Sequence, residues 1–156
     1  MSGSDLYMSN FPPAATVCGV RILLNESEPI ARGDQRIYLA GIDDAHFYRV
    51  DNIEKAALQI PENSFSILLS HTPEVYRQAA HANFNLMLSG HTHGGQICLP
   101  GSIPIKLEAV LPRRMGAGAW QYQNMTGYTS VGVGSSVLPV RLNCPPEITL
   151  HCLRRA

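Results

Sequence analysis

Short apolar runs that end in small or turn-forming residues recur along this chain and predict a fold built mainly from strands. The runs at 65–70 and 85–88 are too short for helical periodicity to develop, and both are followed by turn-forming residues, which favours buried strands. The segment 74–81 between them suits a helix, because Pro73 fits a first helical turn and Glu74 its positive end. Strand, helix and strand in this order predict a βαβ unit with neighbouring parallel strands.

The first third of the chain predicts a small meander and one more helix. Residues 19–25 and 36–42 have strand patterns, with 28–32 pairing with the first of them and a turn at 33–35. Residues 51–59 are amphipathic and predict a helix. Asp51 would cap it, and Glu54 stands three positions later, as in a capping box.

The second half of the chain predicts strands around one long irregular stretch. Residues 96–99, 120–123, 128–132 and 147–153 alternate in the manner of strands, and the last three would complete a second sheet. Residues 132–136 predict a tight turn and not a phosphate-binding loop, because no lysine follows them. Residues 100–118 show no regular pattern, and a loop of this length inside a compact domain is often functional.

Histidines follow both buried strands and are the main candidate for chemistry. His71 comes directly after the strand at 65–70, and His91 and His93 follow the run at 85–88. Parallel strands place their carboxyl ends at one edge of a sheet, where such sheets bind ligands. Imidazole is the commonest metal ligand, and side chains two positions apart point to the same side of an extended chain. The three histidines therefore predict a metal site, with ordinary hydrogen-bonded histidines as the alternative.

Two pairs of charged residues are further candidates. Asp43 and Asp44 end the strand at 36–42, and because adjacent side chains point to opposite sides, at most one can reach a ligand. Turn or helix-capping acids are the alternative there. Arg113 and Arg114 lie in the stretch 100–118, which could overhang the histidines. We predict that they hold an anionic group of a substrate, with a solvated basic loop as the alternative.

The motifs that carry the histidines resemble those of a known family. Ser-His-Thr-Pro-Glu at 70–74 and Ser-Gly-His-Thr-His-Gly-Gly-Gln at 89–96 resemble the last two metal-binding motifs of the calcineurin-like metallophosphoesterases. The segments 40–44 and 139–148 are similar to the bacterial branch with membrane-associated and lipid-phosphoesterase members. The resemblance implies that His71 and His91 ligate one metal ion and that His93 ligates a second.

The resemblance also implies a fold class and an activity. The family fold is an α/β/β/α sandwich, and we expect this α/β chain to form part of it, with mixed sheets and few short helices. The implied activity is hydrolysis of a phosphoester by two divalent ions (Mn, Fe or Zn), which hold hydroxide and phosphate together. The alternative is a non-enzymatic metal-binding or interaction module in which the same histidines hold a structural ion.

The amino-terminal motif series of that family is missing, since Asp-x-His, Gly-Asp and Gly-Asn-His-Asp do not occur here in this order. We therefore expect 19–156 to be the carboxy-terminal part of a metallophosphoesterase domain, truncated and inactive or weakly active alone, and 1–18 to be a poorly ordered lead-in. Uncovered sheet faces and edges predict association with a separate amino-terminal half or with a second copy.

Composition narrows the partners and the compartment. A chain of 156 residues with 45% hydrophobic and 15% charged residues is long enough for one domain and too apolar for disorder. Lysine plus arginine and aspartate plus glutamate number 12 each, which gives no electrostatic reason to expect nucleic acid as a partner. No signal peptide or membrane span is visible, which predicts a cytoplasmic protein or one peripheral to the membrane.

The four cysteines are Cys18, Cys98, Cys144 and Cys152, and none of their spacings matches a metal or redox motif. We expect buried free thiols, with a disulfide as the alternative.

Overall fold

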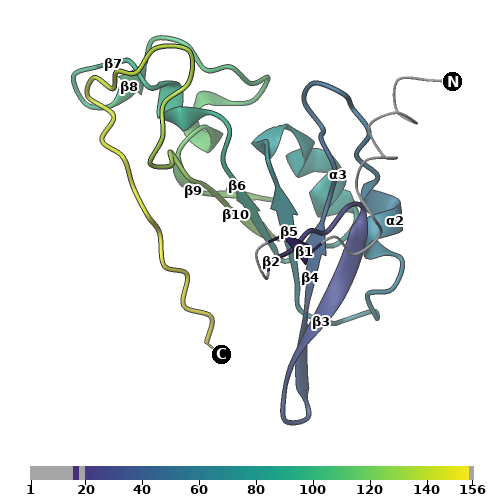
Figure 1. The fold of residues 1–156 in the computed structure, drawn as a ribbon. Helices are drawn as coiled ribbons and strands as arrows, with labels where there is room; N and C mark the ends of the chain where they lie inside the picture. The colour runs from purple at the N-terminus through teal and green to yellow at the C-terminus, as the bar shows by residue number, and fades with distance from the viewer. Residues whose placement is uncertain (1–15, 18–19, 155–156) are drawn as a thin grey trace, which may run out of the picture.

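The computed structural model describes residues 16–17 and 20–154 and is built around a six-stranded sheet (Figure 1). The strands lie in the order β3-β4-β5-β6-β10-β9. Their bounds are β3 Glu26–Arg32, β4 Gln35–Gly41, β5 Ser66–Ser70, β6 Leu86–Ser89, β9 Gly118–Tyr122 and β10 Met125–Thr129. Two small sheets pair β1 Thr16–Val17 with β2 Val20–Arg21, and β7 Cys98–Leu99 with β8 Ile103–Pro104.

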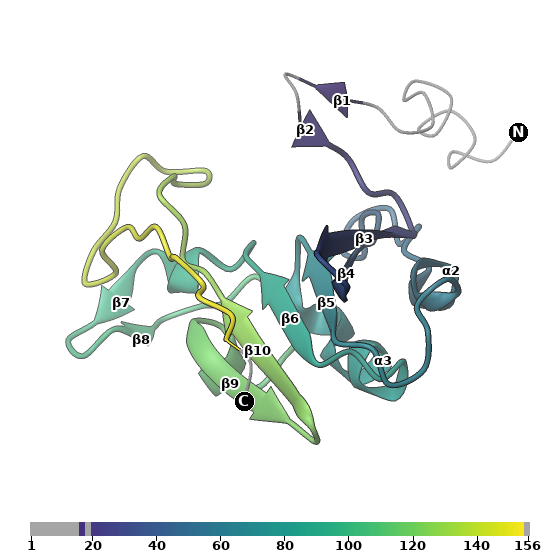
Figure 2. The ribbon, with the colours of Figure 1, turned by 90° about the horizontal axis from the view of Figure 1, so that it is seen from below.

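The central strands of the large sheet are parallel and its edge strands are antiparallel. β4 pairs with β5, β5 with β6 and β6 with β10 in parallel, whereas β3 runs antiparallel to β4 and β9 to β10. Two connections run through helices, α2 Ile53–Ala57 between β4 and β5 and α3 Tyr76–His81 between β5 and β6. The predicted βαβ unit is confirmed, and β4, α2 and β5 form a second one. Figure 2 shows both helices on the same side of the sheet.

The helices begin where polar side chains cap them. The 3₁₀ helix η1, Pro73–Val75, leads into α3, with Thr72 as its cap and Pro73 in its first turn as predicted. At α2 the cap is Asn52, whose Oδ1 accepts a hydrogen bond from the backbone N–H of Lys55 at 2.8 Å. The prediction that Asp51 caps this helix is therefore wrong by one residue. Two further 3₁₀ helices are η2 His93–Gly95 and η3 Arg113–Met115.

The hydrophobic core fills the space between the sheet and the two helices. Side chains alternate along a strand, so Leu68 and Met87 face the helices and are fully buried, whereas Leu86 and Leu88 point to the other face and are half-buried. The buried core residues of the sheet are Ala40, Leu68, Met87, Trp120 and Met125, and those of the helices are Ile53, Ala56, Tyr76 and Ala79.

Trp120 anchors the edge hairpin of β9 and β10. Its Nε1 donates a hydrogen bond to Thr129 Oγ1 at 2.9 Å, and that hydroxyl donates to the carbonyl of Met115 at 2.7 Å. Gly127 lies directly opposite Trp120 in the ladder. A Cβ atom at Gly127 would lie 2.2 Å from atoms of the indole ring. Only glycine therefore leaves room for the tryptophan side chain.

The first predicted meander needs correction. Of the described residues 20–25, only Val20–Arg21 form a strand, and the segment at 28–32 belongs to β3, which pairs with β4 and not with 19–25. The predicted turn is present at Gly33 and Asp34, and Gly33 adopts a φ of 59° there. This angle costs glycine little because it has no Cβ.

The prediction that 120–123, 128–132 and 147–153 form a second sheet is also wrong. β10 pairs with β6, so the strands predicted at 120–123 and 128–132 extend the central sheet. The segment 147–153 is irregular. Its Glu147 carboxylate accepts hydrogen bonds from the hydroxyl of Tyr128 and the N–H of Val131, at 3.1 and 3.2 Å. These side-chain contacts replace a ladder.

The predicted fold class is confirmed as α/β, with a mixed sheet and few short helices. Apart from Thr16–Val17, the lead-in predicted at 1–18 lies outside the described residues. Within the part of the chain that is described, no helix has the length and apolar character needed to cross a bilayer.

Replacing Gly127 with alanine should destabilise the protein by about 1–3 kcal/mol, because overpacking forces the indole ring out of its place. Thermal unfolding followed by circular dichroism should show a midpoint lowered by roughly 2–12 °C. Gly134→Ala is the matched control, since a Cβ there meets no atom within 4 Å. Equal unfolding midpoints for the two variants would contradict the assigned packing of Trp120.

Candidate metal centre at the carboxyl ends of the parallel strands

Two of the three candidate histidines meet where β5 and β6 end. Ser70 and Ser89 are partners in the parallel ladder, and the N–H of Gly90 donates to the carbonyl of His71 at 3.1 Å, which continues the pairing. His71 Nε2 then lies 3.0 Å from His91 Nδ1, with 4.8 Å between the ring centroids. The sheet register thus brings together two imidazoles that are 20 residues apart in the chain.

The spacing of these two rings fits two ligands of one metal ion. A nitrogen ligand lies about 2.0–2.1 Å from Zn²⁺, so two neighbouring ligands of the same ion lie about 3 Å apart. His91 Nε2 is 2.9 Å from the carbonyl oxygen of Glu108. Because a carbonyl only accepts, His91 Nε2 carries the ring proton, and the lone pair of Nδ1 accepts a hydrogen bond from His71 Nε2. A bound metal ion would displace that proton of His71. A carbonyl on the outer nitrogen is the usual partner of a metal-ligating histidine.

The electrostatic surroundings keep His91 in the form that binds metal. Burial lowers the pKa of this imidazole, and His46 and His71 nearby lower it further, against the opposing effect of the hydrogen bond to Glu108. The ring is therefore neutral at pH 7, as a metal ligand must be.

A third imidazole, that of His46, lies against His91 and is held by Glu74. The ring centroids of His46 and His91 are 4.3 Å apart, and His46 Nδ1 is 2.6 Å from Glu74 Oε2. The carboxylate accepts this hydrogen bond, so Nδ1 carries a proton. The two side chains are 25% and 18% exposed. His46 and Glu74 thus form a hydrogen-bonded pair beside the candidate ligands.

Glu74 joins three segments of the chain. Besides the bond from His46, its carboxylate accepts hydrogen bonds from the Thr72 hydroxyl at 3.0 Å and from the N–H of Val110 at 2.7 Å. Burial alone would raise the pKa of Glu74, but these hydrogen bonds outweigh it and hold the pKa below its usual value. The carboxylate therefore stays ionised at pH 7 and ties the loop after β4, the turn after β5 and the stretch 100–118 together.

The Asp44 carboxylate caps backbone N–H groups of the following turn, which was the alternative to a role as a ligand. Its carboxylate accepts hydrogen bonds from the backbone N–H groups of His46, Phe47 and Tyr48. Burial would raise the pKa of Asp44, but these bonds and the nearby His71 lower it overall. Asp44 thereby shapes the turn that delivers His46.

The neighbouring Asp43 is buried. Its Oδ1 accepts from the N–H of Asp44 at 2.7 Å, and among the described residues its Oδ2 has no hydrogen-bond partner.

His93 faces a different neighbour. Its Nδ1 lies 3.4 Å from Arg141 Nη2, and Arg141 Nη1 lies 3.4 Å from the carbonyl oxygen of His93. A guanidinium can only donate, so Nδ1 accepts and the proton of the neutral ring sits on Nε2. His93 therefore has no ring lone pair free for a metal in this arrangement.

The backbone explains why the two histidines of the His-Thr-His sequence diverge. His91 and His93 have φ angles of 67° and 49°, and Thr92 between them is helical with φ −66°. Positive φ is uncommon for residues other than glycine and occurs at turns and functional sites. The prediction that the two rings point to the same side of an extended backbone is therefore wrong, because this segment is a tight turn.

The stretch 100–118 does overhang the histidines, as predicted, through backbone groups. The carbonyl of Glu108 contacts His91, and the N–H of Val110 contacts Glu74. Arg113 and Arg114 lie in η3 and are exposed. That they bind a substrate stays a prediction.

Sequence reasoning missed three contributors to the site, His46, Glu74 and Glu108. Glu74 was visible in the motif at 70–74, but only as a helix-capping acid. His46 stands two positions after Asp44 and follows a buried strand, which was an available signal for a functional histidine. Glu108 acts through its carbonyl oxygen, and no residue type encodes such a contact.

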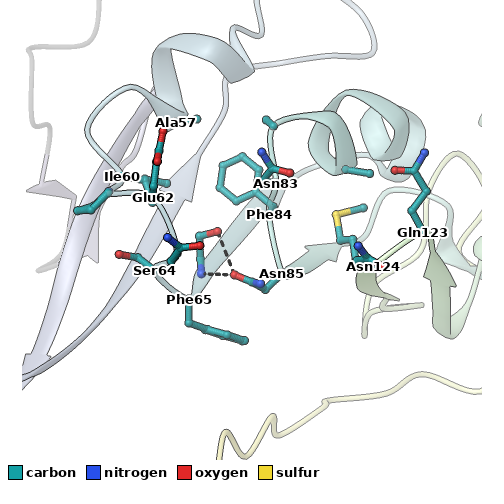
Figure 3. A pocket seen from close by; sticks show the side chains of 16 residues that line it. Ala57, Ile60, Glu62, Ser64, Phe65, Asn83, Phe84, Asn85, Gln123 and Asn124 are labelled. Carbon is teal, nitrogen blue, oxygen red and sulfur yellow. Dashed lines mark hydrogen bonds between the residues drawn. The ribbon is translucent and has the colours of Figure 1, made fainter.

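A cavity of about 760 Å³ lies elsewhere, at the amino ends of the strands (Figure 3). Three of its lining residues, Asn63, Asn83 and Gln123, have positive φ angles of 62°, 61° and 52°, as residues in turns do. Asn85 Oδ1 accepts from the N–H of Ser66 at 2.8 Å. Because open parallel sheets bind ligands at the opposite edge, we regard the histidine cluster as the candidate site.

Within residues 20–154, no group of three or more side chains from histidine, cysteine, aspartate and glutamate is arranged so that it could hold a metal ion. The described residues thus provide two neighbouring candidate ligands of a metal centre, His71 and His91.

Several relatives of this chain are named as metallophosphoesterases or as a phosphodiesterase. The chain is 33% identical over 153 residues to the uncharacterised metallophosphoesterase YkuE of Bacillus subtilis. This alignment covers 97% of the chain and 51% of YkuE. The chain is 30% identical over 132 residues to the phosphodiesterase YaeI of Escherichia coli, covering 85% of this chain and 47% of YaeI. The uncharacterised protein YpbG of B. subtilis is 34% identical over 130 residues, 83% of this chain and 46% of its own length.

No family model and no solved structure matches the chain. It spans about half the length of the curated relatives that it matches. The names of several relatives, YkuE and YaeI among them, together with the two histidine motifs at one edge of a parallel sheet, show that the chain belongs to the calcineurin-like metallophosphoesterase family.

Proposed function

We propose that this chain is the part of a metal-dependent phosphoester hydrolase that supplies His71 and His91 to a divalent ion. The observation that carries this proposal is the 3.0 Å separation of His71 Nε2 and His91 Nδ1 at the carboxyl edge of the sheet. Imidazole suits several first-row metals, so Mn, Fe and Zn ions are all candidates. The name of the relative YaeI, a phosphodiesterase, favours a phosphodiester as the substrate.

The residues of the site divide into ligands and groups that orient them. When bound, a divalent ion supplies charge that polarises a phosphoryl oxygen and lowers the pKa of a bound water. His71 and His91 hold it. The Glu108 carbonyl fixes the orientation of the His91 ring, and Glu74 holds His46 against the same ring. Arg113 and Arg114 are proposed to bind the anionic part of the substrate.

A second metal ion would require His93 to leave its present partner. The lone pair of His93 Nδ1 faces Arg141, and a guanidinium and a metal ion cannot share it. The described residues therefore do not fit a second ion, and we assign His93 no step in the reaction. Its role as a ligand stays a prediction.

The face of the sheet opposite the helices supports association with another polypeptide. In register, Leu39, Ile67 and Leu86 form one row across β4, β5 and β6, and Leu69 and Leu88 belong to the next row. Residues opposite each other in a ladder share a face. Four of these five side chains are half-buried, and in the part of the chain that is described both α-helices pack on the other face.

The five side chains form an apolar band on the face of the sheet opposite the helices, and four of them are partly exposed to water. We propose that a second layer covers it, either from a separate amino-terminal half or from another copy of this chain. The chain's coverage of only about half of its relatives' length is consistent with a missing layer. The missing layer would also supply the carboxylates that a dinuclear centre needs.

His91→Ala should weaken binding of Zn²⁺ and of Mn²⁺ at least tenfold in calorimetric titrations of the purified chain, because it removes one of two ligands. His81→Ala is the control, since His81 is exposed at the end of α3. Equal affinities for the His91 and His81 variants would contradict the proposed site. Metal binding without phosphodiester hydrolysis, even after mixing with an amino-terminal half, would favour the non-enzymatic metal-binding alternative.

Glu74→Gln should lower metal affinity by roughly tenfold, in the range seen when an outer partner of a metal ligand is removed. The amide cannot accept from His46 and Thr72 as the carboxylate does, so the support of His91 loosens. Glu62→Gln, at an exposed glutamate, is the matched control.

The same variant has an expected pH dependence. Because the pKa of Glu74 is lowered in the folded state, its carboxylate stabilises the fold above the pKa of the unfolded chain, and this is lost as pH falls through the folded-state pKa. The difference in unfolding midpoint between wild type and Glu74→Gln should be present at pH 7 and shrink in acid. A difference that does not change with pH would contradict this assignment.

The purified chain should self-associate, with a sedimentation coefficient that rises with concentration. Leu88→Gln should reduce this association, because it places a polar group in the apolar band. Leu58→Gln is the control, since Leu58 is 81% exposed just after α2. A chain that stays monomeric at every concentration would contradict coverage of this face by a second copy.

A further inference from the structure

Two buried cysteines that the proposed reaction does not use lie behind the turn that carries His93. Cys98 is 1% exposed and Cys144 is 6% exposed, although they are far apart in the sequence. Both sulfur atoms contact the carbonyl oxygen of Gly94, that of Cys98 at 3.3 Å and that of Cys144 at 3.8 Å. A shared contact with one oxygen atom places the two thiols side by side.

Cys144 also affects the pKa of the Cys98 thiol. Burial raises the pKa of the Cys98 thiol, and the neighbouring Cys144 side chain raises it further. This effect agrees with the adjacent placement that the shared contact with the Gly94 carbonyl oxygen indicates. In the described part of the chain, both are free thiols.

The backbone around the two cysteines holds this arrangement in place. Ile97 and Leu142 form a parallel bridge, the N–H of Cys98 donates to the carbonyl of Leu142 at 2.9 Å, and the side-chain amide of Asn143 donates to the carbonyl of Cys98 at 3.0 Å. The segments on either side of the thiols are thus joined already. These contacts keep the backbone segments that carry the two thiols next to each other.

We propose that Cys98 and Cys144 are a dithiol site that a low-molecular-weight disulfide, such as oxidised glutathione, converts into an intramolecular disulfide. This site is independent of the proposed phosphoester chemistry. It joins the irregular carboxy-terminal segment to the strand that directly follows the His-Thr-His turn.

The reaction is a double thiol–disulfide exchange. The Cys144 sulfur, after losing its proton, attacks one sulfur of the oxidant, forms a mixed disulfide and releases one small thiol. The Cys98 sulfur then loses its proton, attacks the sulfur of Cys144 and releases the second small thiol. The two cysteines together give up two protons and two electrons, and the oxidant takes them up as two thiols.

Cys144 is the residue that the oxidant reaches first. It is the more exposed of the pair and belongs to a segment without helix or extended strand, which can open locally without unfolding the sheet. Cys98 stays within β7 and acts as the resolving thiol. The bond closes a long loop, so it should stabilise the protein by restricting the unfolded chain.

Oxidation of the full chain with oxidised glutathione, followed by mass spectrometry of peptides, tests the proposal. In native buffer we expect a loss of about 2 Da, the mass of two hydrogen atoms, and a linked peptide pair that contains Cys98 and Cys144. The same chain oxidised in concentrated guanidinium chloride should give several pairings, including ones with the exposed Cys152. The oxidised native protein should unfold at a midpoint raised by roughly 5–10 °C.

The variant Cys18→Ser/Cys152→Ser keeps only the two proposed partners and should still lose both free thiols, whereas adding Cys98→Ser should leave a glutathione adduct or a free thiol on Cys144. The same mixture of pairings in native buffer and in denaturant would overturn the proposal. So would glutathione adducts on Cys98 or Cys144 of the native wild type without a linked peptide.

Discussion

The register of two neighbouring parallel strands is the constraint on which the candidate site depends. Ser70 lies opposite Ser89, and this pairing is what brings His71 and His91 within 3.0 Å. The register is fixed by packing, because a shift of one residue would turn every side chain to the other face. Leu68 and Met87, both fully buried, would then face outward. The hydrophobic core and the spacing of the histidines are therefore determined by the same contacts.

The sequence was sufficient for the parts of the fold that depend on local patterns. The apolar runs at 65–70 and 85–88, with a helix signal between them, led to parallel strands and to two histidines at one edge. The strand predicted at 147–153 failed because alternation alone does not say whether a partner strand is present. The cap of α2 was misplaced by one residue, since Asp51 and Asn52 both have capping side chains and only the geometry decides between them.

The rest of the site depends on contacts between segments far apart in the chain. Glu74 accepts from His46, 28 residues before it, and from Val110, 36 residues after it. His93 turns toward Arg141, 48 residues later, because positive φ angles at residues 91 and 93 break the extended backbone that the motif suggests. These contacts depend on how the loops pack against one another at the edge of the sheet. The spacing of residues in the sequence does not determine that packing.

The sharing of one metal ion by His71 and His91 can be measured directly. Nitrogen-resolved NMR of the imidazoles during titration with Zn²⁺ reports which ring atom of each histidine binds metal. We expect Nε2 of His71 and Nδ1 of His91 both to change to metal-bound shifts at the same Zn²⁺ concentration, while His91 Nε2 keeps its proton. Binding through His91 Nε2, or independent titration of the two rings, would show that they do not share one ion.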